Sequence, residues 1–191
     1  MAYSLGHTPS HKGKTTTTDA IKSLEDFAKV KALVASDVRL NALWHVATNS
    51  ALRASDLVAL TWADLASDGT LTVLERKTHK RRVVPLNDAT LKTLRAWQDE
   101  CAYDHIFSGQ RGQMTVGSWA RIVKDLCDQA GLEGRFASHT CRKSFVRLQH
   151  DVFGTSLPVL MTLLNHSNER QTLTYMGRLQ DDVVKAYAHS L

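Results

Sequence analysis

The sequence predicts a mostly helical domain with one small antiparallel β-sheet. Apolar residues recur every three to four positions through most of the chain, which is the period of an amphipathic helix. That period is interrupted once, between about residues 70 and 84, by a run rich in β-branched and apolar residues. The 191 residues, 43% of them hydrophobic and 23% charged, fit a single soluble globular domain with short tails.

The first helices follow from this period. Thr18 or Asp19 can cap a helix at its N-terminus. A second helix is expected over about residues 37–48, and a short third helix follows Arg53. The first helix would turn these apolar residues inward: Ile21, Leu24, Phe27, Ala28 and Val34.

Residues 70–74 and 82–84 are expected to form a β-hairpin, because β-branched and apolar residues dominate both segments. Residues 76–82 read RKTHKRR, with five Lys or Arg among seven positions. Pro85 ends the hairpin, since proline cannot donate to a β-ladder. The sequence therefore predicts a hairpin with a cationic tip.

Helices are expected to resume after the hairpin and to continue to the C-terminus. Residues 1–18 are polar and basic without periodicity, and are interpreted as a flexible arm. Residues 19–176 would form the domain itself, and residues 177–191 a helical tail. The expected helices cover about 88–101, 116–130, 140–152, 156–164, 171–176 and 181–190.

Composition excludes several protein classes. No apolar run is long enough to span a bilayer, and the N-terminus lacks the apolar stretch of a secretory signal. Three scattered cysteines (Cys101, Cys127 and Cys141) do not suit a disulfide framework or a four-thiolate zinc site. The simpler interpretation is a cytoplasmic chain whose cysteines are reduced. The net charge of +5 indicates a polyanionic partner.

Four polar clusters could carry chemistry, although each alone has a plainer structural interpretation. Arg53 and Asp56 could form a surface ion pair, and Lys77 could be one cation in a solvated run. An H-x-x-R match often arises by chance. A histidine after two leucines is usually a core-edge residue, and a lone tyrosine is usually half-buried packing. The H-x-x-R match is the third cluster, His139 with Arg142, and the histidine and tyrosine of the fourth cluster are His166 and Tyr175.

The order and spacing of these clusters change that interpretation. The pattern R…K…H-x-x-R…H-x8-Y resembles the catalytic domain of the tyrosine recombinases, the integrase family, over about residues 20–176. Local sequences match as well: the lysine hairpin ends in V-P-L, and the last histidine follows L-L-N. The chain departs from the family pattern at Ala51 and Asn165, where glycine is usual, and at Cys141 and Lys143, which replace a common leucine and histidine.

The resemblance implies a role for each matching residue. Tyr175 would attack DNA to form a 3′-phosphotyrosyl link. Arg53 and Arg142 would neutralise the phosphate oxygens, because a guanidinium group binds two oxygens and stays protonated. Asp56 would orient the site, through Arg142 or His139. The remaining catalytic roles would be general acid for Lys77, acid/base for His139 and hydrogen-bond donor for His166.

The resemblance also implies partners. The chain would act on double-stranded DNA as a homo-tetramer on paired sites, and be a monomer or weak oligomer when free. DNA-bending accessory proteins are possible partners, and a phage or mobile element is the expected origin. No cofactor or metal is expected, because P-loop, H-E-x-x-H and dense acidic motifs are absent from the sequence. The expected DNA-binding residues are Arg76, Lys80, Arg81 and Arg82.

Several alternatives stay open. A type IB topoisomerase shares this chemistry but would relax plasmids that lack target sites. A non-catalytic DNA-binding regulator would not become attached to DNA, and a metal hydrolase using some of the nine histidines would be inhibited by a chelator. The chain could be a catalytic fragment or a naturally small recombinase. Its tail could pack on its own domain or on a neighbouring protomer.

Overall fold

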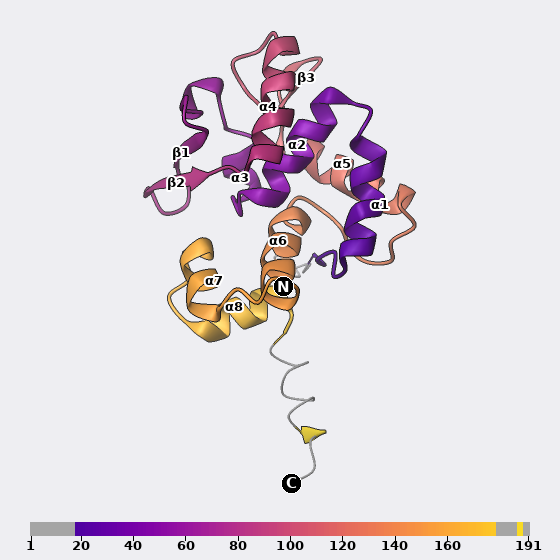
Figure 1. The fold of residues 1–191 in the computed structure, drawn as a ribbon, viewed down its shortest axis with the longest axis vertical. Helices are drawn as coiled ribbons and strands as arrows, with labels where there is room; N and C mark the ends of the chain where they lie inside the picture. Colours follow the sequence, from indigo (N-terminus) through magenta and orange to yellow (C-terminus); the bar gives the residue numbers. More distant parts are fainter. Residues whose placement is uncertain (1–17, 179–186, 189–191) are drawn as a thin grey trace, which may run out of the picture.

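The computed structural model describes residues 18–178 together with 187 and 188, and helices make up most of this part (Figure 1). The fold class predicted from the sequence is confirmed. In chain order the elements are α1 (Leu24–Val34), α2 (Val38–Asn49), α3 (Ala54–Leu57), a 3-10 turn (Trp62–Asp64), β1 (Thr70–Leu74), β2 (Arg81–Pro85), α4 (Asp88–Glu100), β3 (Ser108–Gly109), β4 (Gly112–Gln113), α5 (Val116–Gln129), α6 (Thr140–Asp151), α7 (Leu157–Leu164) and α8 (Glu169–Met176).

The first helix begins later than predicted. Ser23, rather than Thr18 or Asp19, caps α1, because its side chain accepts a hydrogen bond from the Asp26 N–H. Asp19 is engaged elsewhere: its N–H donates to the Arg135 carbonyl, and its carboxylate accepts from the Arg135 N–H. Ile21 is buried all the same, from the extended segment that precedes the helix.

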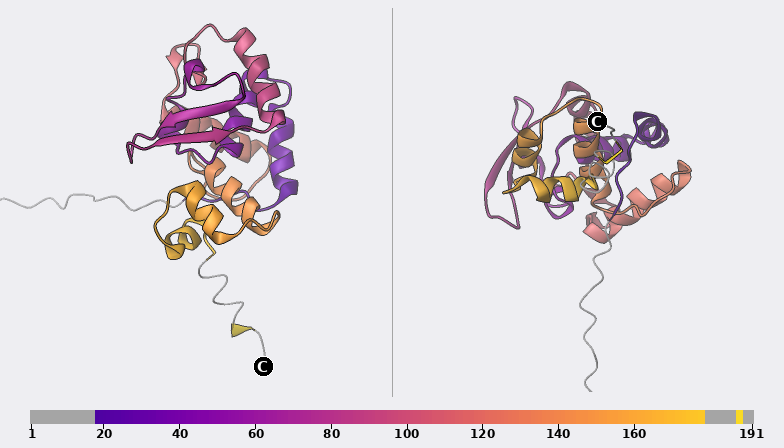
Figure 2. Two further views of the ribbon diagram at one scale, coloured as in Figure 1. Left: turned by 60° about the vertical axis from the view of Figure 1, so that its left-hand side comes forward. Right: turned by 90° about the horizontal axis from the view of Figure 1, so that it is seen from below.

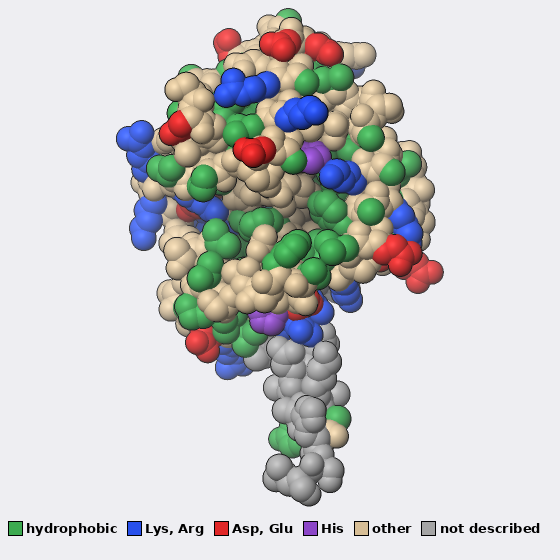
Figure 3. Space-filling view, in the orientation of Figure 1, with side chains coloured by type: hydrophobic (Ala, Val, Ile, Leu, Met, Phe, Trp, Pro, Cys, Tyr) green, Lys and Arg blue, Asp and Glu red, His purple; other side chains and the backbone are tan. Residues whose placement is uncertain are grey.

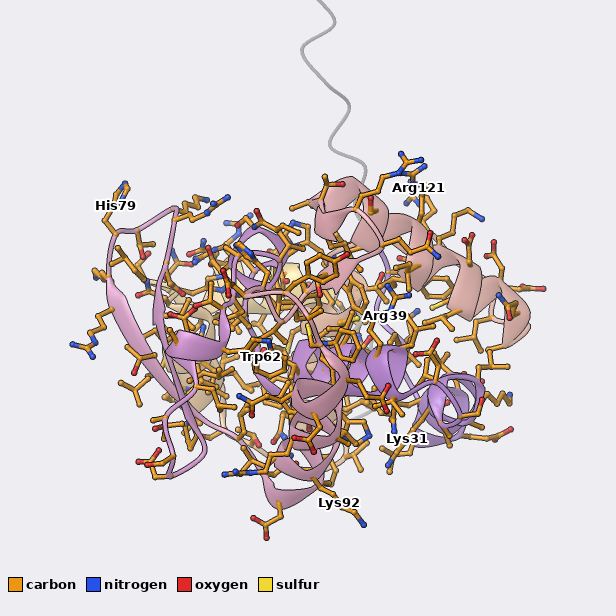
Figure 4. The ribbon with its side chains drawn as sticks, turned by 90° about the horizontal axis from the view of Figure 1, so that it is seen from above. Lys31, Arg39, Trp62, His79, Lys92 and Arg121 are labelled. Carbon is orange, nitrogen blue, oxygen red and sulfur yellow. The ribbon has the colours of Figure 1, made fainter. Side chains whose placement is uncertain are left out.

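The predicted hairpin is present. β1 and β2 pair antiparallel, with Thr70 opposite Pro85 and Leu74 opposite Arg81. Alternate residues of β1 face the core, as the period of a half-buried strand requires. Figure 4 shows His79 at the outer tip of this hairpin, pointing away from the body of the molecule. The short β3–β4 hairpin was not predicted, because its two-residue strands are too short to show any alternation.

Two apolar clusters hold the described residues together. The larger one surrounds α2, whose Trp44 and Leu43 are fully buried. The smaller one joins α6, α7 and α8 through Val146, Leu160, Leu164 and Met176. Figures 1 and 2 show α7 and α8 grouped at one end of the fold, beside α6. The position of α8 therefore depends on its packing against α6 and α7.

Ion pairs reinforce the end of α8. Arg147 on α6 donates to the Met176 carbonyl at 3.1 Å and pairs with Asp151 one turn later. Asp151 also pairs with Arg178 at 3.0 Å, just beyond α8. The end of α8 is thus attached to α6 by both charge and main-chain contacts.

Parts of the expected organisation lie outside the described residues. These are the arm over residues 1–17 and most of the tail helix expected over 181–190. Within the described part of the chain, no helix is long and apolar enough to cross a membrane.

Candidate active site

One cavity brings together the residues that the sequence had singled out. Its volume is about 660 Å³, and it opens between the β1–β2 turn, α3, the start of α6 and the helices α7 and α8. All six predicted catalytic residues line it: Arg53, Lys77, His139, Arg142, His166 and Tyr175. Residues far apart in the sequence therefore meet around one space.

Arg142 is held in this cavity by main-chain oxygens. Its side chain is almost fully buried on α6, with 3% of the residue exposed. Nη1 donates to the Ala51 carbonyl at 2.6 Å, and Nη2 donates to the Leu164 carbonyl at 2.9 Å. These two bonds fix the plane of the guanidinium group before any anion arrives.

The two loops that supply this support keep a left-handed backbone without glycine. Ala51 has φ +51° and Asn165 has φ +56°. Asparagine adopts this conformation readily, whereas for alanine it costs about 1 kcal/mol. Both positions therefore keep a left-handed backbone, the conformation in which glycine is most common, although neither is glycine.

Glu75 is a buried acid that the sequence interpretation missed. It lies just after β1 and is 1% exposed. Its Oε2 is 2.9 Å from Arg53 Nη1, and its Oε1 is 3.5 Å from Arg82 Nη1. Thr78 Oγ1 donates to Oε2 at 2.6 Å, and Asn165 Nδ2 does so at 3.4 Å. One carboxylate thus joins the arginine of the site to the hairpin and to the α7 loop.

The charges around Glu75 keep it ionised. Burial raises its pKa, but the hydrogen bonds from Thr78 and Arg53 and the charges of Arg53 and Arg82 outweigh burial and lower the pKa to about 2. A signal for this residue was present in the sequence. Glu75 follows Leu71 and Val73 at two-residue spacing, which places an acid on the inward face of the strand.

Arg82 does not have the environment expected of a DNA contact. It is half-buried and donates to the Ser50 carbonyl at 3.1 Å, as well as approaching Glu75. Its guanidinium group therefore supports the loop at Ser50 and Glu75, and its predicted contact with DNA stays a prediction. Arg76, Lys80 and Arg81 are exposed. Figure 3 shows Lys and Arg side chains gathered along the edge formed by this hairpin.

Asp56 supports the hairpin instead of Arg142 or His139. It is buried on α3, and its Oδ1 accepts a hydrogen bond from the Arg76 N–H at 3.1 Å. Its Oδ2 lies 4.0 Å from Arg53 Nη1. Among the described residues, its contacts therefore orient Arg53 and the backbone that carries Lys77.

Both histidines of the cavity are biased toward the neutral form. Burial lowers the pKa of His139, as do the charges of Arg142, Lys143 and Arg53. Burial, followed by the charges of Arg142, Arg53 and Lys77, lowers the pKa of His166 to about 4. His166 Nδ1 lies 3.0 Å from Thr172 Oγ1, which fixes the ring. A neutral imidazole can accept a proton at one nitrogen and donate a hydrogen bond from the other.

Tyr175 packs its ring among cations and an imidazole. Its ring meets His166 edge-on, with 5.6 Å between centroids and 80° between planes. The guanidinium carbon of Arg142 lies 5.9 Å from the ring centroid. Burial raises the pKa of Tyr175, and Arg142 opposes that effect. Its buried hydroxyl has no hydrogen bond of normal geometry within residues 18–178. Burial of an unpaired hydroxyl costs free energy, which an incoming polar group would reduce by forming a hydrogen bond.

The arrangement suits a bound anion. Arg53, Arg142 and Lys77 place three cationic side chains around the cavity, which the phenol of Tyr175 also lines. In the described part of the chain, no group of three or more His, Cys, Asp or Glu is placed to hold a metal ion.

Comparisons with known proteins show similarity to integrases and tyrosine recombinases. The model of the phage integrase family matches residues 14–181. Tyrosine recombinase XerC of Xanthomonas campestris pv. campestris is 32% identical over 154 residues, which cover 78% of this chain and 48% of that protein. The probable integrase/recombinase YoeC of Bacillus subtilis is 29% identical over 172 residues, covering 87% of this chain and 93% of that protein.

Solved structures share the fold. XerA recombinase superposes with a TM-score of 0.73 at 20% identity, covering 87% of this chain and 63% of that chain. The lambda integrase catalytic core superposes with a TM-score of 0.63 at 19% identity, covering 77% of this chain and 90% of that chain. The chain spans about half the length of the XerC and XerD relatives that it matches.

Proposed function

This chain belongs to the phage integrase family, and from that membership we propose that it is a site-specific recombinase that cleaves and rejoins DNA strands through a covalent 3′-phosphotyrosyl intermediate. One observation carries the proposal: a tyrosine, two arginines, a lysine and two neutral-biased histidines line a single cavity. A module that only binds DNA has no need of this nucleophile.

The first step is capture of the scissile phosphate. A phosphodiester carries one negative charge, and its pentavalent transition state carries more. Arg53 and Arg142 would each present a planar fork to the non-bridging oxygens. Their positions are set beforehand by Glu75 and by two main-chain carbonyls. Each preorganised donor of this kind is worth about 3–4 kcal/mol in the transition state.

The second step is the displacement. The Tyr175 oxygen attacks phosphorus, a Tyr–O–P bond forms, and the bond from phosphorus to the 5′-oxygen breaks. The phenolic proton passes to neutral His139, and Lys77 protonates the departing 5′-oxygen. His166 donates a hydrogen bond to a phosphate oxygen from the nitrogen not directed at Thr172. Attack by the 5′-hydroxyl of another strand reverses the step and needs no nucleotide cofactor.

DNA binding would rely on the exposed hairpin. Arg76, Lys80 and Arg81 are free to neutralise backbone phosphates of double-stranded DNA, so the affinity should fall steeply with salt. We further propose assembly as a homo-tetramer on paired sites in the cytoplasm. The tetramer is supported by a lambda integrase of similar fold, which is described as a tetramer bound to a Holliday junction.

Covalent trapping tests the proposal directly. Labelled duplexes with a randomised core and a nick beside the candidate phosphates would lose the short leaving strand after attack, and so trap the intermediate. Wild type is expected to form a denaturant-resistant adduct, and Tyr175→Phe is expected to form none. Tyr103→Phe is the matched control, because Tyr103 lies outside the cavity and binds the Gln110 carbonyl.

The outcomes separate the competing functions. An adduct that survives a chelator opposes a metal hydrolase. Relaxation of plasmids without target sites would indicate a topoisomerase. No adduct with wild type across the randomised pool would overturn the proposal and leave a DNA-binding regulator as the better interpretation.

A further inference from the structure

Lys143 reaches the ring of the proposed nucleophile. It lies on α6 immediately after Arg142, and its Nζ is 5.3 Å from the centroid of the Tyr175 ring. A cation within about 6 Å of an aromatic face is attracted by the ring quadrupole. The Tyr175 ring is therefore held by Lys143 as well as by Arg142 and His166.

The same ammonium group binds the N-terminal segment, residues 18–21. Lys143 Nζ donates to the Thr18 carbonyl at 2.8 Å. The segment has two further attachments: Asp19 exchanges two hydrogen bonds with Arg135, and the Ile21 N–H donates to Ser144 Oγ at 2.8 Å. Lys143 is thus the side chain through which this segment and Tyr175 share one contact.

We propose that Lys143 is a positioning residue that couples the docking of residues 18–21 to the orientation and ionisation of Tyr175. An effect of Lys143 on catalysis rests on the proposed function, whereas the contact between Lys143 and the Tyr175 ring is independent of it. When the segment is docked, the Thr18 carbonyl holds the ammonium group in place against the ring. When the segment is released, the flexible lysine chain loses that restraint and the ring loses a fixed cation.

The charge of Lys143 gives the coupling an electrostatic consequence. A fixed cation beside the ring favours phenolate over phenol, so loss of the Lys143 charge should raise the pKa of the phenol. Burial lowers the pKa of Lys143, and the Asp19 carboxylate opposes that effect. The other titratable or charged groups that face this pair are Arg53, Lys77, His139, Cys141, Arg142 and His166.

A titration of the nucleophile itself tests the proposal without DNA. Tyr175 is replaced in the full chain by 3,5-difluorotyrosine, whose phenol ionises near neutrality, and its ionisation is followed by absorbance. Lys143→Met should raise that pKa by about one unit, and Lys143→Arg should leave it nearly unchanged. Lys124→Met is the matched control, because Lys124 is an exposed lysine on α5 that pairs with Asp128.

Release of the segment tests the coupling. Asp19→Ala removes the side-chain half of the Asp19–Arg135 attachment and should raise the same pKa by a smaller amount, with no further effect once Lys143→Met is present. An unchanged pKa in Lys143→Met overturns the proposal, and an unchanged pKa in Asp19→Ala overturns the coupling to the segment. In the trapping assay, Lys143→Met should slow adduct formation at pH 7 about tenfold. Absence of a wild-type adduct would instead count against the proposed function.

Discussion

Replacement of Glu75 by glutamine should destabilise the protein in a pH-dependent way. The pKa of Glu75 falls from an ordinary 4.5 to about 2 in the folded state. At about 1.4 kcal/mol per pH unit, ionised Glu75 stabilises the fold by about 3 kcal/mol at neutral pH. Glu75→Gln keeps the shape of the side chain but removes the charge that Arg53 and Arg82 face.

The sign of the effect follows from the direction of the pKa change. Because the folded-state pKa lies below the unfolded one, the stabilisation is complete above about pH 4.5 and is lost as the pH falls toward 2. The difference between wild type and Glu75→Gln should therefore be about 3 kcal/mol at pH 7 and less than about half of that at pH 3.

Urea unfolding followed by circular dichroism measures this difference at each pH. Glu100→Gln serves as the control, because Glu100 is exposed at the end of α4 and should change stability by no more than about 0.5 kcal/mol. A cost below about 1 kcal/mol for Glu75→Gln at pH 7, or an equal cost at pH 3, would refute the role given to this carboxylate.

Three further predictions concern the chemistry and the position of Tyr175. Lys77→Ala should lose cleavage of ordinary DNA but recover it on a 5′-bridging phosphorothiolate, whose leaving group needs no proton; failure of that rescue removes Lys77 as the general acid. The pKa of His166 is lowered to about 4, so the imidazole stays neutral from pH 5 to 8 and should add no pH dependence to the single-turnover rate over that range. His166→Gln should retain more activity than His166→Leu, because glutamine can still donate a hydrogen bond. Asp151→Asn weakens the attachment of α8 to α6 and should slow adduct formation about tenfold, or about 1.4 kcal/mol, without changing DNA affinity in a gel-shift assay; equal rates would show that the Met176 contact suffices.

Much of the fold could be predicted because its signals are local. Helix α2 and the β1–β2 hairpin follow directly from hydrophobic period and capping residues. The predicted start of α1 was wrong because three residues able to cap a helix, Thr18, Asp19 and Ser23, lie within six positions, and Asp19 binds the distant Arg135 instead. Contacts of that range leave no trace in the local pattern.

The site divides in a similar way. The six cavity residues were found through order and family resemblance, since no spacing rule alone brings Arg53 next to Tyr175. Glu75 lay on the inward face of a strand and could have been found by its register. The inward turn of Arg82 could not have been predicted from the strand register, because it depends on hydrogen-bond acceptors in the loop at Ser50.

The Ala51 carbonyl has a consequence for experiment. This single main-chain oxygen accepts hydrogen bonds from Arg142 at 2.6 Å and from Arg82 at 3.4 Å. Replacement of side chains one at a time, the usual survey of an enzyme, leaves such an atom untouched, and position 51 is already alanine. A survey of that kind would attribute the effects to the arginines and overlook the peptide group that aims them, whereas an ester in place of the amide after Ala51 would weaken the acceptor itself.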